Sequence, residues 1–369
     1  MKVLALSSYG VLGGAELSLA TFLEHRPEGV EAVALLVDGG PLAARLAELG
    51  VPVHSAHGYA GRPTVTRAVR FARELSTFLE RERPDVVWAL GQKAALLAVA
   101  PCRRRRIPLV WHKVDFSWDR VLAAPLAEGV NGVVCVSQAV AGALGPLGGR
   151  RLLGVVHPPL RLSESLRAEP DRDEPVIGTL ARLVPYKGHH HILAAAAQLS
   201  EEFPRLRVVL AGGPVAEFPR YPAELEQLAA ELGMSGRVEL PGFVDDVEAI
   251  LRRLSVFVNA TFRDEEGFGL EGLSGAMLEA SWAGVPVVAT GGGGTAEGLL
   301  DGQTGTLVPE AEPGAIAAAV APYLRDPALA AKTGAAGMEF ARARCAPEPA
   351  SRRLFDLLAV PAGVRRSGQ

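Results

Sequence analysis

Short runs of apolar and β-branched residues alternate with longer helical patterns along almost the whole chain. In the first half, six such runs have the character of strands, and the segments between most of them have the residue spacing of helices. Apolar strands flanked by helices are typical of a parallel sheet covered on both faces. The sequence therefore predicts an α/β protein. The expected strands are KVLALSS (2–8), VEAVALLV (30–37), VPVHSA (51–56), DVVWAL (85–90), PLVWHK (108–113) and GVVCVS (132–137).

The alternation pauses once, at residues 158–175, where PPLRLSESLRAEPDRDEP is rich in proline and charge and lacks apolar periodicity. We interpret this segment as an inter-domain linker. The strand and helix patterns then restart. The expected later strands are VIGTL (176–180), LRVVLAG (206–212), RVELPGF (237–243), SVFVNA (255–260), VPVVAT (285–290) and TGTLV (304–308), and the closing helices lie near 313–324, 327–344 and 347–358.

The predicted organisation is two Rossmann-like, doubly wound domains that face a central cleft. We expect the first domain to span residues 1–165 and the second 166–345. Residues 346–369 are expected to form a C-terminal helix and tail, with the option that the helix crosses back to the first domain. Because ligands bind at the carboxyl ends of strands in such sheets, the cleft is the expected functional site.

Charge and cysteine content argue against several classes of function. The formal net charge is −3, so nothing global attracts nucleic acid. The three cysteines are scattered and odd in number, which indicates no disulfide framework and a reducing compartment. The N-terminus meets glycines too early for a signal peptide, and no run approaches the roughly 18 apolar residues of a membrane span. We expect a soluble, cytoplasmic protein.

The first candidate site residues are two cations, Arg182 and Lys187, in GTLARLVPYKGHH. They lie on the loop between the strand VIGTL and the next helix. Two cations there could clamp a diphosphate and stabilise the charge that develops on it as it leaves. The alternative is a pair of solvated loop cations, but the carboxyl end of a strand favours a ligand.

Two carboxylates, Glu271 and Glu279, form the second candidate set, in EGLSGAMLEASWAGVPVVAT. Eight helical residues span about 12 Å, too far for both groups to touch one atom but suited to a sugar at one end and a ribose at the other. Glu279 could instead be a helix-surface charge, although its neighbours are mostly apolar, and a carboxylate among apolar residues needs a partner or a function. The small residues Gly272, Ser274 and Gly275 let an anion approach backbone N–H groups at the helix start.

These residues resemble the large family of retaining GT-B glycosyltransferases often called family 4. Its C-terminal signature is an Arg and a Lys five residues apart after a strand, followed by a Glu-x7-Glu segment. Arg182/Lys187 and Glu271/Glu279 match both spacings. The resemblance covers essentially the whole C-terminal half and implies a GT-B fold, with acceptor bound by the N-terminal domain and nucleotide sugar by the C-terminal one. Other matching stretches are AGGP (211–214), GFVDDVEAIL (242–251), SVFVNA (255–260) and GGTAEGLLDGQTGTLVP (293–309).

The first glutamate of the signature has two candidates. The family often shows Glu-Gly-Phe-Gly-Leu there, and Glu266–Leu270 spells it. However, the residue eight positions after Glu266 is Ser274, whereas Glu279 stands eight positions after Glu271. We interpret FRDEEGFGL as an extended loop and Glu271 as the sugar-contacting residue, with Glu266 as the alternative.

In the N-terminal half, GVLGGAELSLA (10–20) resembles the Gly-Gly-Ala-Glu segment of the family. Gly13 and Gly14 would bring amide N–H groups near the distal phosphate at a helix start, although a glycine turn after a strand is common. His112 ends the strand PLVWHK, and the family commonly has a histidine there, close to the reacting sugar. The alternative is an ordinary histidine at a strand end. Where the family often has an Arg, this chain has Val114, which leaves the roles of Lys113 and Asp115 open.

The resemblance implies a front-face substitution in which the departing diphosphate helps to take the acceptor proton. Arg182, Lys187 and the Gly13/Gly14 amides would stabilise the leaving group, so that no metal is needed. His112 and Glu271 would bind the sugar, and Glu279 would accept hydrogen bonds from the ribose diol. The remaining expected donor contacts are Gly242, Phe243 and Val244, which would read the base through the backbone, and Gly272, Leu273, Ser274 and Gly275.

The expected function is therefore hexosyl transfer from a nucleotide sugar to a hydroxyl acceptor, without a further cofactor. A UDP-sugar is the first candidate donor and a GDP-sugar the second. The acceptor could be a natural product, a sugar or cyclitol, or a lipid. Rival interpretations are an epimerase or phosphorylase on the same fold, and a non-catalytic nucleotide-sugar sensor. The arginine run Arg103–Arg106 is expected to be a solvated loop, with a peripheral membrane patch as the alternative.

Overall fold

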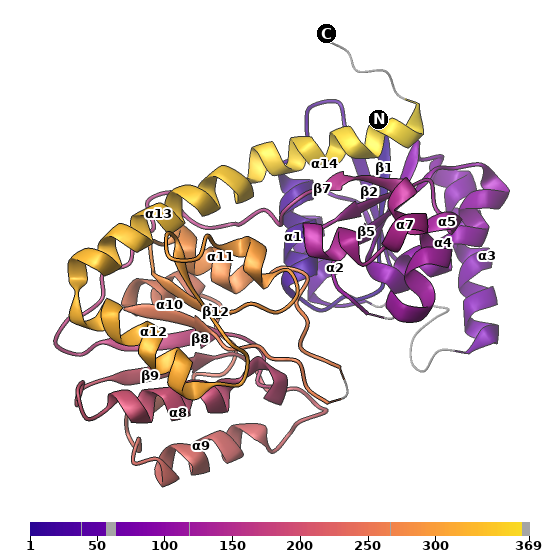
Figure 1. The fold of residues 1–369 in the computed structure, drawn as a ribbon. Coiled ribbons are helices and arrows are strands. Elements are labelled where there is room, and N and C mark those ends of the chain that lie inside the picture. The colour runs from indigo at the N-terminus through magenta and orange to yellow at the C-terminus, as the bar shows by residue number, and fades with distance from the viewer. Residues whose placement is uncertain (38, 57–63, 118, 266, 364–369) are drawn as a thin grey trace. The chain divides into compact units, whose positions relative to one another are not determined.

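The structure is a computed structural model that describes residues 1–37, 39–56, 64–117, 119–265 and 267–363 (Figure 1). The chain divides into two compact units, Met1–Arg161 together with Cys345–Gln369, and Leu162–Arg344. The first boundary thus falls four residues before the expected one at 165, and the C-terminal segment belongs to the N-terminal unit. Each unit has its own sheet and its own hydrophobic core.

The N-terminal unit is built on a seven-stranded parallel sheet. The strand order reverses between β1 and β4, and such a reversal is the topological switch point where ligands bind in doubly wound sheets. In spatial order the strands are β3 (Val53–Ser55), β2 (Glu31–Leu36), β1 (Lys2–Ser7), β4 (Val86–Leu90), β5 (Leu109–Lys113), β6 (Gly132–Cys135) and β7 (Leu152–Val155).

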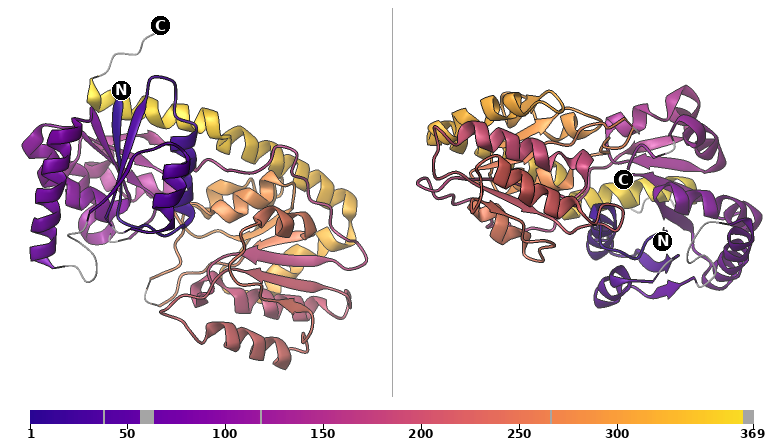
Figure 2. Two further views of the ribbon diagram at one scale, coloured as in Figure 1. Left: turned by 180° about the vertical axis from the view of Figure 1, so that it is seen from behind. Right: turned by 90° about the horizontal axis from the view of Figure 1, so that it is seen from below.

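Helices pack against this sheet in two groups (Figures 1 and 2). The first group shares one apolar core with the strands, in which Phe22, Trp88 and Phe355 are at most 2% exposed. The second group consists of α3, which packs on α4, and α4, which packs on β5 and α5. The first group is α1 (Gly14–Glu24), α2 (Pro41–Glu48) and α14 (Pro347–Ala362); the other helices are α3 (Val65–Glu82), α4 (Gly91–Arg105), η1 (Asp119–Ala123), α5 (Ala124–Gly129), α6 (Gln138–Gly142), α7 (Gly145–Gly148) and η2 (Gly149–Arg151).

The C-terminal unit repeats the plan with six parallel strands. Its switch point lies between β8 and β11, and α8 and α12 share a core with the strands. In spatial order the strands are β10 (Val238–Glu239), β9 (Arg207–Ala211), β8 (Val176–Leu180), β11 (Val256–Asn259), β12 (Val287–Thr290) and β13 (Gly305–Val308). The helices are η3 (Pro185–Lys187), α8 (His189–Leu199), α9 (Tyr221–Glu231), α10 (Val247–Arg253), α11 (Gly275–Trp282), η4 (Thr295–Gly298), α12 (Pro313–Arg325) and α13 (Pro327–Cys345).

All twelve strands expected from the sequence are present, and both sheets are doubly wound, which confirms the α/β prediction. The sequence analysis missed β7. This edge strand is only half-buried, Gly154 interrupts its apolar run, and it follows a glycine-rich succession of short helices. A short, interrupted edge strand leaves a weak pattern.

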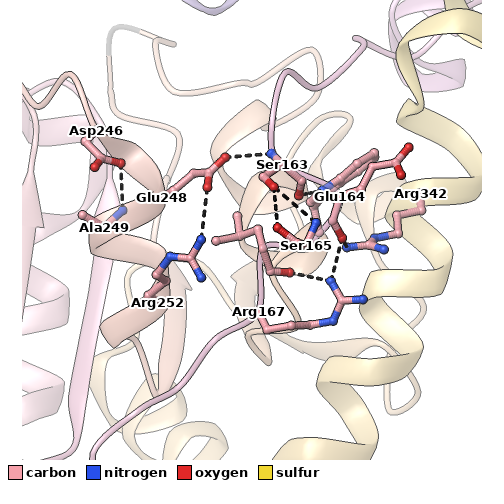
Figure 3. Close-up of polar contacts among 11 residues, drawn as sticks. Ser163, Glu164, Ser165, Arg167, Asp246, Glu248, Ala249, Arg252 and Arg342 are labelled. Atoms are coloured by element: carbon pink, nitrogen blue, oxygen red, sulfur yellow. Dashed lines mark hydrogen bonds and ion pairs between the residues drawn. The ribbon is translucent and has the colours of Figure 1, made fainter.

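The segment interpreted as a linker is docked on the C-terminal unit from Leu162 onward. The Ser163 N–H donates a hydrogen bond to Glu248 at 2.7 Å, and the Trp282 indole donates one to the Ser163 carbonyl at 3.1 Å (Figure 3). Leu166 is fully buried, and the Ala168 N–H donates to the Ala283 carbonyl at 2.8 Å. A single buried leucine among charged residues produces no periodicity, which explains why the pattern resembled a free linker.

The C-terminal helix α14 lies in the N-terminal unit, where it packs on α1 and on strands β4, β5 and β6. Leu354 and Leu358 are fully buried there. On the helix surface, residues at such four-residue spacing share one face, so an apolar stripe of α14 completes the core of the first unit. Although α13 and α14 are long, no helix in the described ranges is long and apolar enough to span a membrane.

Candidate active site

Lys187 and Glu271 meet at the switch point of the C-terminal sheet. Lys187 ends η3, which follows β8, and Glu271 lies in the loop between β11 and α11. The Lys187 Nζ donates a hydrogen bond to Glu271 Oε1, and the two groups form an ion pair. Their side chains are only 19% and 12% exposed. The fold thus brings together two sequence motifs that are 84 residues apart.

A network of buried polar groups at the end of β11 holds the Glu271 carboxylate. Asn259 Nδ2 donates to Glu271 Oε2 at 3.2 Å, and Thr261 Oγ1 is 3.1 Å from Glu271 Oε1. Asn259 and Thr261 are 5% and 4% exposed. Both residues were missed in the sequence analysis. The signal was available, because an asparagine is the penultimate residue of the expected apolar strand SVFVNA, at the carboxyl edge of the sheet.

Gly188 lets the loop after β8 approach the loop after β11 closely. Its φ is +71°, and a Cβ at this position would overlap the Ala260 carbonyl. Only glycine combines a left-handed φ with so close a backbone approach. The step from η3 into α8 therefore depends on this residue and sets Lys187 beside Glu271.

Arg182 adds a second cation to the loop. It is exposed, and its guanidinium lies 3.4 Å from the Tyr186 hydroxyl. Burial, and secondly the charge of Arg182, lower the pKa of Lys187 to about 8, against the opposite pull of the Glu271 carboxylate. Because Glu271 pairs with the Lys187 charge, the exposed Arg182 leaves the loop net positive, which favours an anionic ligand.

The start of α11 presents free backbone donors close in sequence to Glu271. Ser274 is the N-cap residue, but its side chain makes no capping hydrogen bond, and the first turn carries no acidic residue. The first N–H groups of a helix have no intrahelical partner and attract anions. Gly272 and Ser274 are buried, and Leu273 and Gly275 are half-buried. Gly272, Leu273 and Ser274 lead directly into the helix, whose first residue is Gly275.

Glu279 lies one turn into α11 and is half-buried between buried Leu278 and Ala280. Its carboxylate has no hydrogen bond or ion pair with any residue that the structure describes, whereas its backbone carbonyl accepts from the Ala283 N–H. Burial raises the pKa of its carboxyl from 4.5 to about 7. A desolvated carboxylate without a protein partner fits a hydroxyl-bearing ligand. The alternative first glutamate, Glu266, lies outside the described residues.

The loop after β10 carries the three residues expected near the base. Gly242 has a φ of +73°, and its carbonyl accepts a hydrogen bond from the Gly212 N–H at 2.9 Å. Phe243 is 67% exposed and Val244 is half-buried. The hydrogen bond ties this loop to the end of β9, next to β8, so its backbone lies at the same sheet edge as Lys187.

In the N-terminal unit, Gly13 and Gly14 lie between β1, a strand that borders the switch point, and α1. Gly13 is the N-cap residue of α1 and makes no side-chain cap, and Gly14 is the first helical residue. A Cβ on Gly13 would lie 2.8 Å from a carboxylate oxygen of Glu16, whereas Gly14 has open space around it. The N–H groups at the start of this eleven-residue helix therefore lie at the carboxyl end of β1.

His112 lies within β5 and is 3% exposed. The Trp88 indole N–H donates to His112 Nδ1 at 3.3 Å, and Phe22 packs against the imidazole ring. Burial lowers the pKa of His112 to about 4, so the ring is neutral, and because Nδ1 accepts, its proton sits on Nε2. His112 Nε2 has no hydrogen-bond partner in the described part of the chain.

The neighbours whose roles the sequence left open are structural. Lys113 is 1% exposed, and its Nζ lies 2.6 Å from Asp119 Oδ1 and donates to the Asp115 carbonyl. It therefore anchors the loop after β5. Ser137, which follows β6, accepts a hydrogen bond from the Val140 N–H at 3.2 Å and caps α6.

A cavity of about 330 Å³ in the C-terminal unit lies away from these residues. Its lining includes Leu254 and Ser255, which precede β11, and Pro286, which precedes β12. It is therefore at the amino ends of the strands, whereas Lys187 and Glu271 follow the carboxyl ends. The chemistry-bearing side chains gather at the edge where doubly wound sheets bind ligands, and the cavity does not.

Comparisons with known proteins place the chain in a family. The family described as "Glycosyl transferases group 1" matches residues 164–340, and "Glycosyl transferase 4-like domain" matches residues 13–159. The GDP-mannose-dependent alpha-(1-6)-phosphatidylinositol monomannoside mannosyltransferase of Mycolicibacterium smegmatis is 31% identical over 284 residues, which are 70% of this chain and 72% of that protein. The D-inositol 3-phosphate glycosyltransferase of Corynebacterium urealyticum is 37% identical over 155 residues, 41% of this chain and 35% of that protein.

Solved structures agree on the fold. Anabaena Alr3699/HepE in complex with UDP superposes with a TM-score of 0.83 at 23% sequence identity, covering 97% of this chain and all of that one. The two doubly wound sheets found here are those of a GT-B protein, and the predicted fold and family resemblance are both confirmed. The chain belongs to the glycosyl transferases group 1 family and is a hexosyltransferase with the GT-B fold.

Proposed function

We propose that this hexosyltransferase moves a hexose from a nucleoside diphosphate sugar to a hydroxyl acceptor with retention of the anomeric configuration. The observation that carries the proposal is the Lys187–Glu271 pair at the switch point of the C-terminal sheet, just before the uncapped start of α11. This arrangement supplies a cation for a diphosphate, a carboxylate for sugar hydroxyls, and backbone donors for an anion.

The leaving diphosphate would be stabilised without a metal ion. Lys187 and Arg182 offer two positive charges on one loop, and α11 begins without an acidic residue in its first turn. The N–H groups at Gly13 and Gly14 would contact the distal phosphate. Preorganised charges and dipoles of this kind are the main source of catalysis when charge develops on a leaving group.

Sugar and ribose would be held by separate carboxylates. Glu271, fixed by Asn259 and Thr261, accepts hydrogen bonds from the hexose hydroxyls. His112 donates through Nε2–H to a hydroxyl of the same sugar, and its neutral ring adds no charge there. Glu279, which has no protein partner in the described chain, accepts from the ribose diol.

Retention would follow from a front-face substitution. The bond between the anomeric carbon and the diphosphate oxygen breaks, and the acceptor oxygen bonds to the same face of that carbon. The acceptor proton passes to the departing phosphate oxygen, so charge and atoms balance without a further base. The protein then contributes positioning and stabilisation of the leaving group.

Two donors are proposed. A UDP-sugar is the first candidate, supported by the UDP complex of the structural relative HepE. GDP-mannose is the second, supported by the name of the Mycolicibacterium relative. The ribose contact of Glu279 is common to both, whereas a deoxyribose donor would lack one of its two hydroxyls.

The first prediction concerns Lys187. UDP or GDP should raise the melting temperature of the wild type, and Lys187→Ala should remove most of the rise, because the diphosphate loses its buried cation. The matched control is Lys332→Ala, an exposed lysine on α13, which should keep the full rise. Product mass spectrometry with pooled acceptors then detects transfer. The proposal fails if no nucleotide shifts the wild type, or if an isomerised donor is the product without acceptor.

A further inference from the structure

Two polar residues at the switch point of the N-terminal sheet have no part in the proposed donor chemistry. Ser8 is 1% exposed, and its Oγ has no hydrogen-bond partner in the described part of the chain. Gln92 is half-buried, and both atoms of its carboxamide are buried without a partner there. Buried polar atoms in folded proteins are almost always hydrogen-bonded, because leaving them unpaired costs free energy. Two such residues at one sheet edge therefore point to a ligand.

The strand register places these residues together with His112. Ser8 directly follows β1, and Gln92 is the second residue of α4, which begins where β4 ends. Ser7 pairs with Leu90 across β1 and β4, and Leu90 pairs with His112 across β4 and β5. The unpartnered groups of Ser8, Gln92 and His112 thus belong to three adjacent strand ends.

The neighbouring residues show that the two loops touch. The Lys93 ammonium lies 5.1 Å from the centre of the Tyr9 ring, so the segments after β1 and after β4 are side by side. Tyr9 is 52% exposed. The Tyr9 ring offers an apolar face at this edge of the sheet. The ring faces of sugars and cyclitols carry C–H groups that pack on such a surface.

The unpartnered atoms match hydroxyl groups. A serine hydroxyl and a glutamine carboxamide each donate and accept hydrogen bonds. A hydroxyl group does the same, whereas an anion could use only the donor groups and would leave the Gln92 carbonyl oxygen unpaired. The set therefore suits an uncharged ring that carries several hydroxyl groups.

We propose that Ser8 and Gln92 bind the hydroxyls of the acceptor, and that the acceptor is an uncharged polyol ring, a sugar or a cyclitol. This inference rests on the proposed function, and it names the acceptor class and two residues that determine acceptor specificity. His112, on the next strand, marks the reacting end of the site, and Ser8 and Gln92 hold the acceptor ring beside it.

The test measures acceptor kinetics with whichever of UDP-glucose and GDP-mannose is turned over. The probes are myo-inositol and methyl α-D-glucopyranoside as neutral polyols, an inositol monophosphate as a charged one, and octanol as an apolar alcohol. In Gln92→Leu and Ser8→Ala, the acceptor KM for a neutral polyol should rise roughly tenfold, with donor KM and the nucleotide-induced melting shift unchanged. Gln198→Leu, an exposed glutamine on α8, should keep the wild-type acceptor KM.

Deoxy acceptors give a second readout that a merely structural effect would not move. Removal of the hydroxyl that Gln92 binds should weaken the wild type but cost Gln92→Leu little more, because the partner is already gone. Equal losses in both enzymes would overturn the assignment.

Failure of the proposed function and failure of the acceptor inference give different results. If no nucleotide shifts the wild type, the proposed function is wrong. If nucleotides bind but no neutral polyol is glycosylated, or octanol or the phosphorylated inositol is preferred, or the variants keep their acceptor KM, only the acceptor inference is overturned.

Discussion

Two residues of the proposed donor site, Lys187 and Glu271, bind each other and are also proposed to bind substrate. Lys187 and Glu271 neutralise each other while both are mostly buried, yet each is assigned to a different part of the same substrate. A bound diphosphate would compete for the lysine, and bound hydroxyls would take over the carboxylate. The hydrogen bonds from Asn259 and Thr261 would keep Glu271 in place during that exchange. A preformed carboxylate loses little entropy when substrate arrives, which is the advantage of a supported site.

Glu279 shows a conflict between function and stability that can be measured. Its pKa is raised from 4.5 to about 7 by burial, so the folded state binds the proton more tightly than the unfolded chain. For such a group the contribution to stability is present below about pH 4.5 and is lost as the pH rises through about 7. The ionised carboxylate that a ribose requires therefore destabilises the fold at neutral pH.

The second prediction follows from the direction in which the pKa of Glu279 is shifted. Glu279→Gln has no charge to bury, so at pH 8 it should be more stable than the wild type by roughly 1–3 kcal/mol, and near pH 4 the difference should vanish. Urea unfolding at both pH values measures it, with the exposed Glu226→Gln as control. Wild-type nucleotide affinity should fall below about pH 7 as the carboxyl is protonated. A variant that gains no stability at pH 8, or binds nucleotide as tightly as the wild type, would contradict this role.

At the scale of elements, α14 is distant in sequence from the unit that it completes. Its stripe of Leu354, Phe355 and Leu358 is at most 2% exposed and belongs to the same core as Phe22 and Trp88. Trp88 in turn donates to His112, so the helix supports the neighbours of a site residue.

The third prediction is that Leu354→Ala destabilises the N-terminal unit by about 2–5 kcal/mol, since it leaves a cavity between α14 and the sheet. Arg352→Ala, an exposed neighbour on the same helix, should change stability by less than about 0.5 kcal/mol. Chemical unfolding followed by tryptophan fluorescence measures the stability of each variant, and Trp88 lies in this core. Equal stability of the two variants would mean that α14 is not part of the folding unit.

The strands could be predicted from the sequence more completely than the contacts of the site. Strands buried on both faces have a continuous apolar pattern, so the strands VVWAL and VFVNA could be located from the sequence. The segment 162–168 did not, because one buried leucine and several backbone hydrogen bonds leave no periodicity. Lys187 and Glu271 could be proposed from spacing, whereas their direct contact and the supporting Asn259 depend on how β8 and β11 pair across the switch point.

At the scale of the whole molecule, two doubly wound sheets repeat one plan, and each carries its candidate residues at its own switch point. The C-terminal unit supplies the charged groups suited to a nucleotide diphosphate. The N-terminal unit supplies helix N–H groups after β1, and neutral polar side chains after β1 and β4 and near the end of β5. This division of charged and neutral chemistry between the units fits the charged leaving group and the uncharged, hydroxyl-bearing acceptor that are proposed above.

The most direct test of the central claim is the anomeric configuration of the product, read by nuclear magnetic resonance. With an α-linked UDP-hexose or GDP-mannose labelled at the anomeric carbon and a polyol acceptor, the account predicts an α-linked product. Glu271→Gln should form it at least about 100-fold more slowly, because the hexose loses its fixed carboxylate. A β-linked product, or an unchanged rate in Glu271→Gln, would contradict retaining transfer at this site.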